Sequence, residues 1–108
     1  MDMNEYQVWT RTTAIYPKDG DIAEHYLMSA LTGEVGEVAS LVKRKIRDNT
    51  PRDVYLEDMK KELGDVLWYL ARFADELGFE LGDVAEANRD KLLKRQAANT
   101  LHGKGDNR

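Results

Sequence analysis

The stretch LTGEVGEVAS, residues 31–40, decides the fold class, because its apolar side chains recur at helical spacing. Leucines and valines return every three or four residues, which is the pattern of an amphipathic helix. Two carboxylates interrupt that pattern. On a wheel of about 100° per residue, Glu34 falls inside the apolar stripe and Glu37 falls at its edge. A carboxylate in such a position is costly unless it is paired with a cation or holds a metal ion.

A second stretch, KKELGDVLWYL at residues 60–70, repeats this arrangement. Its apolar side chains define a core-facing side, Glu62 borders that side, and Asp65 and Tyr69 continue a polar strip along one flank. Two helices therefore each carry two acids, three residues apart, at the boundary of a predicted core.

The spacing of these acids is weak evidence alone, since 20 acids in 108 residues produce several such pairs by chance on solvated helix faces. Their position in an apolar stripe strengthens the case for a site. Glycines beside them strengthen it further, because each costs about 1 kcal/mol inside a helix relative to alanine. We expect another helix or a ligand to approach closely at Gly33, Gly36 and Gly64.

The chain is predicted to be all-α, most simply a four-helix bundle, because no stretch alternates with a period of two for long enough to form a strand. Asp21 is expected to cap the second helix, and Gly78 to end the third. Thr50 and Pro51 indicate a cap followed by the first residue of the third helix. The predicted helices cover residues 3–16, 22–47, 51–77 and 81–98.

Composition limits the possible functions. A chain of 108 residues that is 42% hydrophobic makes one domain, which we place at residues 1–98, followed by a polar tail at 99–108. A net charge of −4 argues against a nucleic-acid partner, and the absence of cysteine excludes thiol chemistry. No apolar run is long enough for a membrane span and no signal peptide is recognisable, so a cytoplasmic location is expected.

The fourth predicted helix carries cations and an amide on or beside its apolar side. Asn88 and Arg95 fall within that side, and Lys91 flanks it. Lys91 and Arg95 then either lie over the surface and pair with nearby acids, or face the same cavity as the four acids. The second arrangement would suit a substrate whose phosphates are bridged by a divalent metal ion.

The residue types at the acidic motifs narrow the chemistry. Ligand sets made only of oxygen select Mg²⁺ first, then Mn²⁺, with Ca²⁺ as an alternative. Zinc would favour histidine or cysteine, and the only histidines are His25 and His102. No glycine-rich phosphate loop and no Ser-His-Asp set can be assembled. Of the kinds of catalysis considered, metal-assisted hydrolysis is the one that these residues favour.

The complete pattern resembles a known family. Glu34-x-x-Glu37, 24 intervening residues and Glu62-x-x-Asp65 look like the signature of the MazG-like branch of the all-α nucleoside triphosphate pyrophosphohydrolases. The segments LTGEVGEVASLVKRKIRD, KKELGDVLWYLARFADELG and ANRDKLLKRQ resemble family segments in the expected order, and the ending HGKGDNR resembles small single-domain members.

The resemblance implies hydrolysis of a nucleoside triphosphate to a monophosphate and pyrophosphate, as house-cleaning of noncanonical nucleotides or trimming of deoxynucleotide pools. It also implies that all four acids hold Mg²⁺ and act in catalysis, and that members assemble as dimers or tetramers whose neighbouring chains complete each site. We expect one acid, for instance Glu37, to act as the general base. The positions that match substrate-contacting or site-shaping residues are Lys43, Tyr69, Asn88, Lys91 and Arg95.

Two questions stay open at this stage. A non-catalytic helical interaction module, whose acids only form salt bridges, is the alternative to an enzyme. Base and sugar preference are also open, because aromatic side chains at helical spacing are typical of a core as well as of a stacking surface. The aromatic candidates for stacking are Tyr6, Trp9, Tyr16, Tyr26 and Trp68.

Overall fold

The computed structural model describes residues 1–106 and confirms the all-α class, with no strand among those residues. No helix in this part of the chain is long and apolar enough to cross a membrane. The elements in chain order are α1 (Met3–Thr10), the 3₁₀ helix η1 (Arg11–Thr13), α2 (Ile22–Asp48), α3 (Arg52–Glu76) and α4 (Leu81–Ala97).

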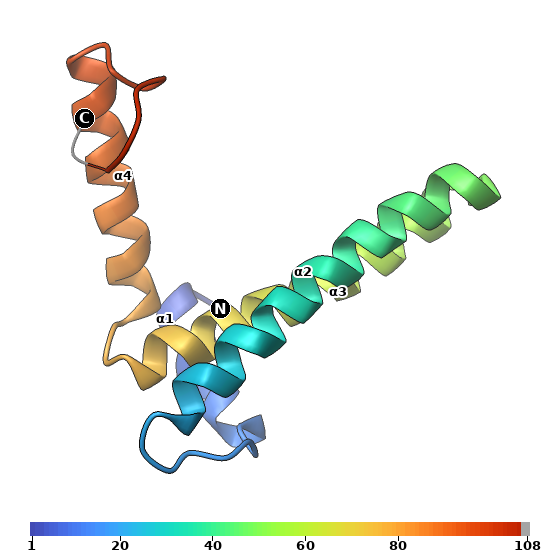
Figure 1. Ribbon diagram of the computed structural model, residues 1–108, viewed down its shortest axis with the longest axis horizontal. Coiled ribbons are helices and arrows are strands. Elements are labelled where there is room, and N and C mark those ends of the chain that lie inside the picture. The colour runs from blue at the N-terminus through green and yellow to red at the C-terminus, as the bar shows by residue number, and fades with distance from the viewer. Residues whose placement is uncertain (107–108) are drawn as a thin grey trace.

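The four helices adopt an open arrangement (Figure 1). α2 and α3 form a long antiparallel hairpin, α1 packs at its base, and α4 leaves from the same base and points away from the hairpin (Figure 1). The Cα radius of gyration is 16.9 Å, whereas a compact chain of this length would have about 13 Å. The single chain therefore does not wrap its four helices around one closed core.

The core of the chain lies at the base of the hairpin. One buried cluster joins the segment before α2 to the hairpin, and a second joins α3 to the start of α4. Leu27 and Leu81 are almost completely buried in these clusters. The first cluster contains Ala14, Tyr16, Ala23 and Leu27, with Trp68, Tyr69 and Phe73 packed against it. The second contains Ala71, Ala74 and Leu81, with Tyr6 packed against it.

Side chains of α1 fix the direction in which α4 leaves. The buried Gln7 accepts a hydrogen bond from the backbone N–H of Leu81 at 2.8 Å and donates one to the carbonyl of Phe79 at 2.8 Å. Asn4 accepts from the N–H of Gly82 at 2.8 Å. The first backbone N–H groups of a helix have no partner within that helix. Two α1 side chains supply acceptors here, and this ties the start of α4 to α1.

A buried arginine holds α3 to the segment before α2. The Arg72 side chain is 4% exposed and pairs with Asp75 at 2.8 Å and Glu76 at 3.3 Å. It also donates to the hydroxyls of Tyr16 and Thr10. Burial, together with the hydrogen bond from the Tyr16 hydroxyl to Glu76, raises the pKa of Tyr16 to about 12. These contacts give the buried guanidinium hydrogen-bond and charge partners, without which its burial would destabilise the fold.

The predicted end of the first helix is wrong. The regular helix stops at Thr10 and one 3₁₀ turn follows, so residues 14–16 are not helical. The hydroxyls of Thr10, Thr12 and Thr13 each donate to the carbonyl three residues earlier. Such local bonds compete with the helical ladder, which explains the early end.

The other helix boundaries agree with prediction to within one residue, but two caps differ. Asp21 precedes α2 without capping it through its side chain, and Pro51 lies just before α3 with ψ 144° rather than in its first turn. The stop at Gly78 is confirmed, because its φ of +83° is left-handed. Its N–H bonds to Asp75 and that of Phe79 bonds to Ala74, the pairing of a Schellman cap.

Much of the apolar stripe along the hairpin is exposed, whereas the helical wheel predicted that it would face a core. Leu27 and Leu41 are buried as expected, but Ile46 is 78% exposed. Two helices can cover only one side of each other, so the rest of each apolar stripe is left uncovered by the described residues. Further exposed members of the two stripes are Val35, Val42, Leu63, Leu70 and Leu77.

Candidate functional site

Three of the four predicted acids meet across the hairpin. Glu34 comes from α2, and Glu62 and Asp65 come from α3. Each offers a carboxylate oxygen, and these three atoms all lie within 4.8 Å of one another. Glu34 and Glu62 are half-buried and Asp65 is exposed. Residues three apart in a helix lie on adjacent turns of one face, which explains why both α3 acids reach the same point.

The fourth acid lies beside this group but outside it. Glu37 is exposed and follows Glu34 by three residues on α2. It is close enough for its charge to contribute to the raised pKa of Glu34. It does not belong to the set of three whose oxygens converge. The structure therefore separates Glu37 from the three acids, whereas the family resemblance implied that all four hold the metal ion.

Like charges dominate the electrostatics of the site. The pKa of Glu34 is raised, first by burial and then by the charges of Asp65, Glu62 and Glu37. Within residues 1–106, no ion pair and no side-chain hydrogen bond involves any of these four acids. This arrangement differs from the network of salt bridges that the interaction-module alternative requires.

Aromatic side chains border the acids on one side. Burial raises the pKa of Tyr69, and the nearby Tyr26, Glu34 and Asp65 raise it further. Burial also raises the pKa of Tyr6, with a contribution from Asp65. Tyr69 is therefore close enough to Glu34 and Asp65 for their charges to act on its hydroxyl. Tyr6, which sequence analysis treated only as a candidate stacking surface, also lies near Asp65.

The Tyr69 ring is held by its neighbour. Trp68 packs edge-on against it with ring centroids 4.9 Å apart, and the Trp68 indole N–H donates to the Thr13 hydroxyl at 2.8 Å. The segment before α2 thus braces the aromatic side of the site.

Among residues 1–106, no other helix comes close to the glycines beside the acids. A Cβ atom added at Gly33, Gly36 or Gly64 would meet nothing within 4 Å. Of the two expected kinds of approach, a helix or a ligand, the described residues of a single chain supply no helix, and the approach of a ligand stays a prediction. The space beside the acids is open.

The α4 residues are not brought to the acids of their own chain. Asn88 and Lys91 belong to α4, which points away from the hairpin (Figure 1). They line an open depression together with Phe79 and Val84. Arg95 is buried near the end of the same helix. Lys43 lies on α2, nine residues beyond Glu34, which is about 13 Å further along the helix axis.

The cations of α4 contact an acid that sequence analysis did not single out. Lys91 and Arg95 both donate to the Asp106 carboxylate at 3.2 Å. The pairing of these cations with a nearby acid, the first of the two predicted arrangements, is therefore observed within the chain. The glycines that flank Lys104 could have indicated this contact in the sequence, because glycines allow the backbone to turn back toward α4.

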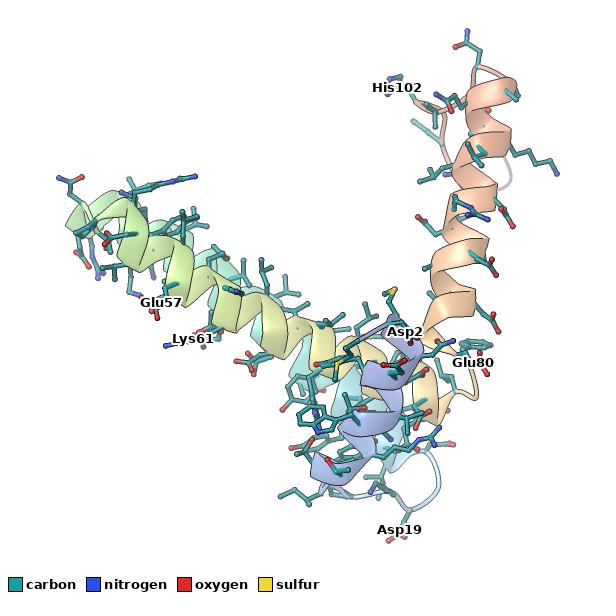
Figure 2. The ribbon with its side chains drawn as sticks, turned by 180° about the vertical axis from the view of Figure 1, so that it is seen from behind. Asp2, Asp19, Glu57, Lys61, Glu80 and His102 are labelled. Atoms are coloured by element: carbon teal, nitrogen blue, oxygen red, sulfur yellow. The ribbon has the colours of Figure 1, made fainter. Side chains whose placement is uncertain are left out.

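A divalent cation fits the group of three acids. The donors are all carboxylate oxygens, which hard cations such as Mg²⁺ prefer, and no histidine belongs to the group. His102 lies at the far end of the α4 arm (Figure 2). A metal ion would also offset the repulsion that raises the pKa of Glu34.

The fold and the site define a helical protein with an acidic centre built from two helices. A family model described as the MazG nucleotide pyrophosphohydrolase domain matches residues 23–99, and the chain belongs to this family. The matched residues include all of the hairpin except Ile22, with all four predicted acids, and α4.

One relative matches the chain along its whole length. The sequence is 38% identical over 114 residues to the Gene 37 protein of Mycobacterium phage L5, and the match covers 100% of both chains. No solved structure matches the chain significantly.

Proposed function

We propose that the protein hydrolyses nucleoside triphosphates, either ribonucleotides or deoxynucleotides, to the monophosphate and pyrophosphate in a Mg²⁺-dependent reaction. The observation that carries this proposal is the convergence of Glu34, Glu62 and Asp65 within 4.8 Å with no described cation to neutralise them. Such a cluster is destabilising by itself and is suited to a divalent ion and the phosphates it bridges. Family membership supplies the nucleotide substrate class.

The acids take different roles in this proposal. Glu34, Glu62 and Asp65 hold the metal ion, which when bound neutralises phosphate charge and lowers the pKa of a water molecule. Glu37 is exposed beside them and outside the converging set, so it is free to accept a proton from the attacking water. Tyr69 borders the acids and contacts the nucleotide, while Lys43 contacts phosphates from further along α2.

We also propose that the working enzyme is a homodimer or homotetramer. The α4 helix leaves its own hairpin (Figure 1) and carries Asn88, Lys91 and Arg95. We propose that these side chains lie at the acids of a neighbouring copy. The exposed apolar stripes of α2 and α3 supply surface for such an interface. A specific interface of this kind buries more than about 1,000 Å².

The remaining proposals concern partners and location. With a net charge of −4, the chain is a poor ligand for nucleic acid or an anionic membrane surface. We propose a protein of the cytoplasm that acts on free nucleotides, as a single domain at residues 1–98. Part of the proposed tail at 99–108, residues 107–108, lies outside the described structure.

A product assay tests the proposed reaction. Canonical and modified triphosphates are incubated with Mg²⁺, and nucleotide products and pyrophosphate are measured separately. We expect monophosphate and pyrophosphate in equal amounts, no reaction in EDTA, and recovery with Mg²⁺ or Mn²⁺. Diphosphate as the first product would contradict the assigned cleavage position, and no turnover of any triphosphate would favour the interaction-module alternative.

A further inference from the structure

The tail that follows α4 folds back onto that helix. The backbone turns at Asn99, which has a φ of +57°, and again at Gly105, which has a φ of +77°. The second turn places the Asp106 carboxylate against α4, where one of its oxygens accepts from Lys91 and Arg95 at 3.2 Å each. Two cations one turn apart on a helix therefore share one acid that arrives from the end of the chain.

The cations form a built site rather than a loose surface patch. The Arg95 side chain is 6% exposed and that of Lys91 is 37% exposed. The Nε of Arg95 is buried and has no hydrogen-bond acceptor among the described residues. A guanidinium can present Nε and a terminal nitrogen along one edge to two oxygens of a single anion. One terminal nitrogen of Arg95 donates to the Asp106 carboxylate at 3.2 Å and to the Gly105 carbonyl at 3.3 Å, whereas the described part of the tail leaves Nε without an acceptor.

The acid that occupies this site is held weakly. The Asp106 side chain is 82% exposed, so water screens its attraction to both cations. Its pKa is lowered by the hydrogen bonds from Lys91 and then Arg95, so it is an anion at neutral pH. A phosphate group carries more charge than one carboxylate and has more acceptor oxygens, which makes it the stronger ligand for two cations.

We propose that Lys91 and Arg95 form an oxyanion site that the Asp106 carboxylate of the same chain occupies, and that pyrophosphate or a nucleotide's terminal phosphates displace it. The tail is then an internal competitor that lowers the affinity of α4 for phosphate groups. It also keeps the buried Arg95 from lacking a counter-ion when no ligand is bound. The consequence for catalysis rests on the proposed function, whereas the competition between Asp106 and a free phosphate does not.

Binding of inorganic pyrophosphate to the full chain tests this proposal. Titration calorimetry is carried out in EDTA, so that neither a metal ion nor turnover contributes, on the natural chain and on Asp106→Asn. The substitution keeps the shape of the side chain and removes its charge. Because exposed ion pairs are weak, we expect pyrophosphate to bind about fivefold more tightly to the variant.

A matched variant removes the effect of net charge. Asp90 is exposed on α4 and forms an ion pair with Arg89. Asp90→Asn therefore removes the same negative charge as Asp106→Asn without changing a contact of Lys91 or Arg95. We expect its affinity to stay within about twofold of the natural chain. Adding Lys91→Ala to Asp106→Asn is expected to abolish the gain, which places the binding at this pair and avoids replacing the buried Arg95.

Three outcomes would overturn the proposal. Equal affinity of Asp106→Asn and Asp90→Asn would mean that the gain is a general charge effect. Weaker binding by Asp106→Asn would mean that the tail supports the ligand rather than competing with it. The absence of pyrophosphate binding in every variant would mean that no oxyanion site exists at Lys91 and Arg95. None of these results depends on triphosphate turnover, so the product assay can fail or succeed independently.

Discussion

Glu62→Gln separates a metal site from a structural role for the acids. The carboxylate oxygens of Glu62, Glu34 and Asp65 lie within 4.8 Å of one another, and two unit charges at that distance repel by about 0.9 kcal/mol in water. The substitution keeps the volume of the side chain and removes two such repulsions. Allowing for screening by salt, we expect the metal-free variant to be more stable by about 1 kcal/mol, or roughly 4 °C in Tm.

The same substitution removes a metal ligand. When Mg²⁺ is present at 100 times its Kd, it should stabilise the natural chain by about 2.7 kcal/mol. If the loss of one carboxylate weakens binding tenfold, that stabilisation falls to about 1.4 kcal/mol at the same Mg²⁺ concentration. The variant should therefore be more stable than the natural chain in EDTA, gain less from Mg²⁺, and show no hydrolysis.

Thermal melts in EDTA and in Mg²⁺, at one protein concentration, measure both effects. Glu57→Gln is the matched control, because Glu57 lies on the outer side of the same helix toward the free end of the hairpin (Figure 2). We expect the control to change neither the Mg²⁺ response nor turnover. A Glu62→Gln protein that is weakened in EDTA and responds to Mg²⁺ like the natural chain would refute the metal-site assignment.

Five further outcomes can be checked by thermal melts, activity assays or light scattering. Asp75→Asn should cost about 2–3 kcal/mol, because Arg72 is buried and loses a charged partner, whereas removal of the exposed Asp48 charge in Asp48→Asn should change Tm little. Arg11 and Arg72 lower the pKa of Asp75, so its contribution to stability is present above the ordinary aspartate pKa and is lost as the pH falls through the lowered value; that loss should be missing in Asp75→Asn. Gly78→Ala should destabilise by about 1–2 kcal/mol because φ is +83°, while Gly64→Ala, in open helical space, should stabilise by about 1 kcal/mol and lower activity if a ligand approaches there. Light scattering at micromolar concentration should show a dimer or tetramer, and a fully active monomer would contradict the proposed assembly.

The sequence by itself determined which segments form helices, except at the end of α1, and which acids share a helix face. Apolar spacing near 3.6 residues fixes which side chains share a helix face, so Glu62 and Asp65 could be placed together without a structure. The stop at Gly78 could be predicted because few other residues accept a left-handed turn. The threonine-rich end of α1 was missed, since its hydroxyl bonds depend on a local competition that periodicity does not describe.

Only the tertiary structure decided which other elements of the chain lie against each helix face. Periodicity gives the direction of a side chain from its own axis, but not the position of the neighbouring axis, so it placed Glu37 at the edge of the apolar stripe but could not show that Glu37 lies outside the converging group. It also could not show that Gln7 and Asn4 direct α4 away from the hairpin. That direction leaves apolar stripes exposed on α2 and α3. The same direction keeps Lys91 and Arg95 apart from the acids of the hairpin. Both cations bind Asp106 of the tail instead.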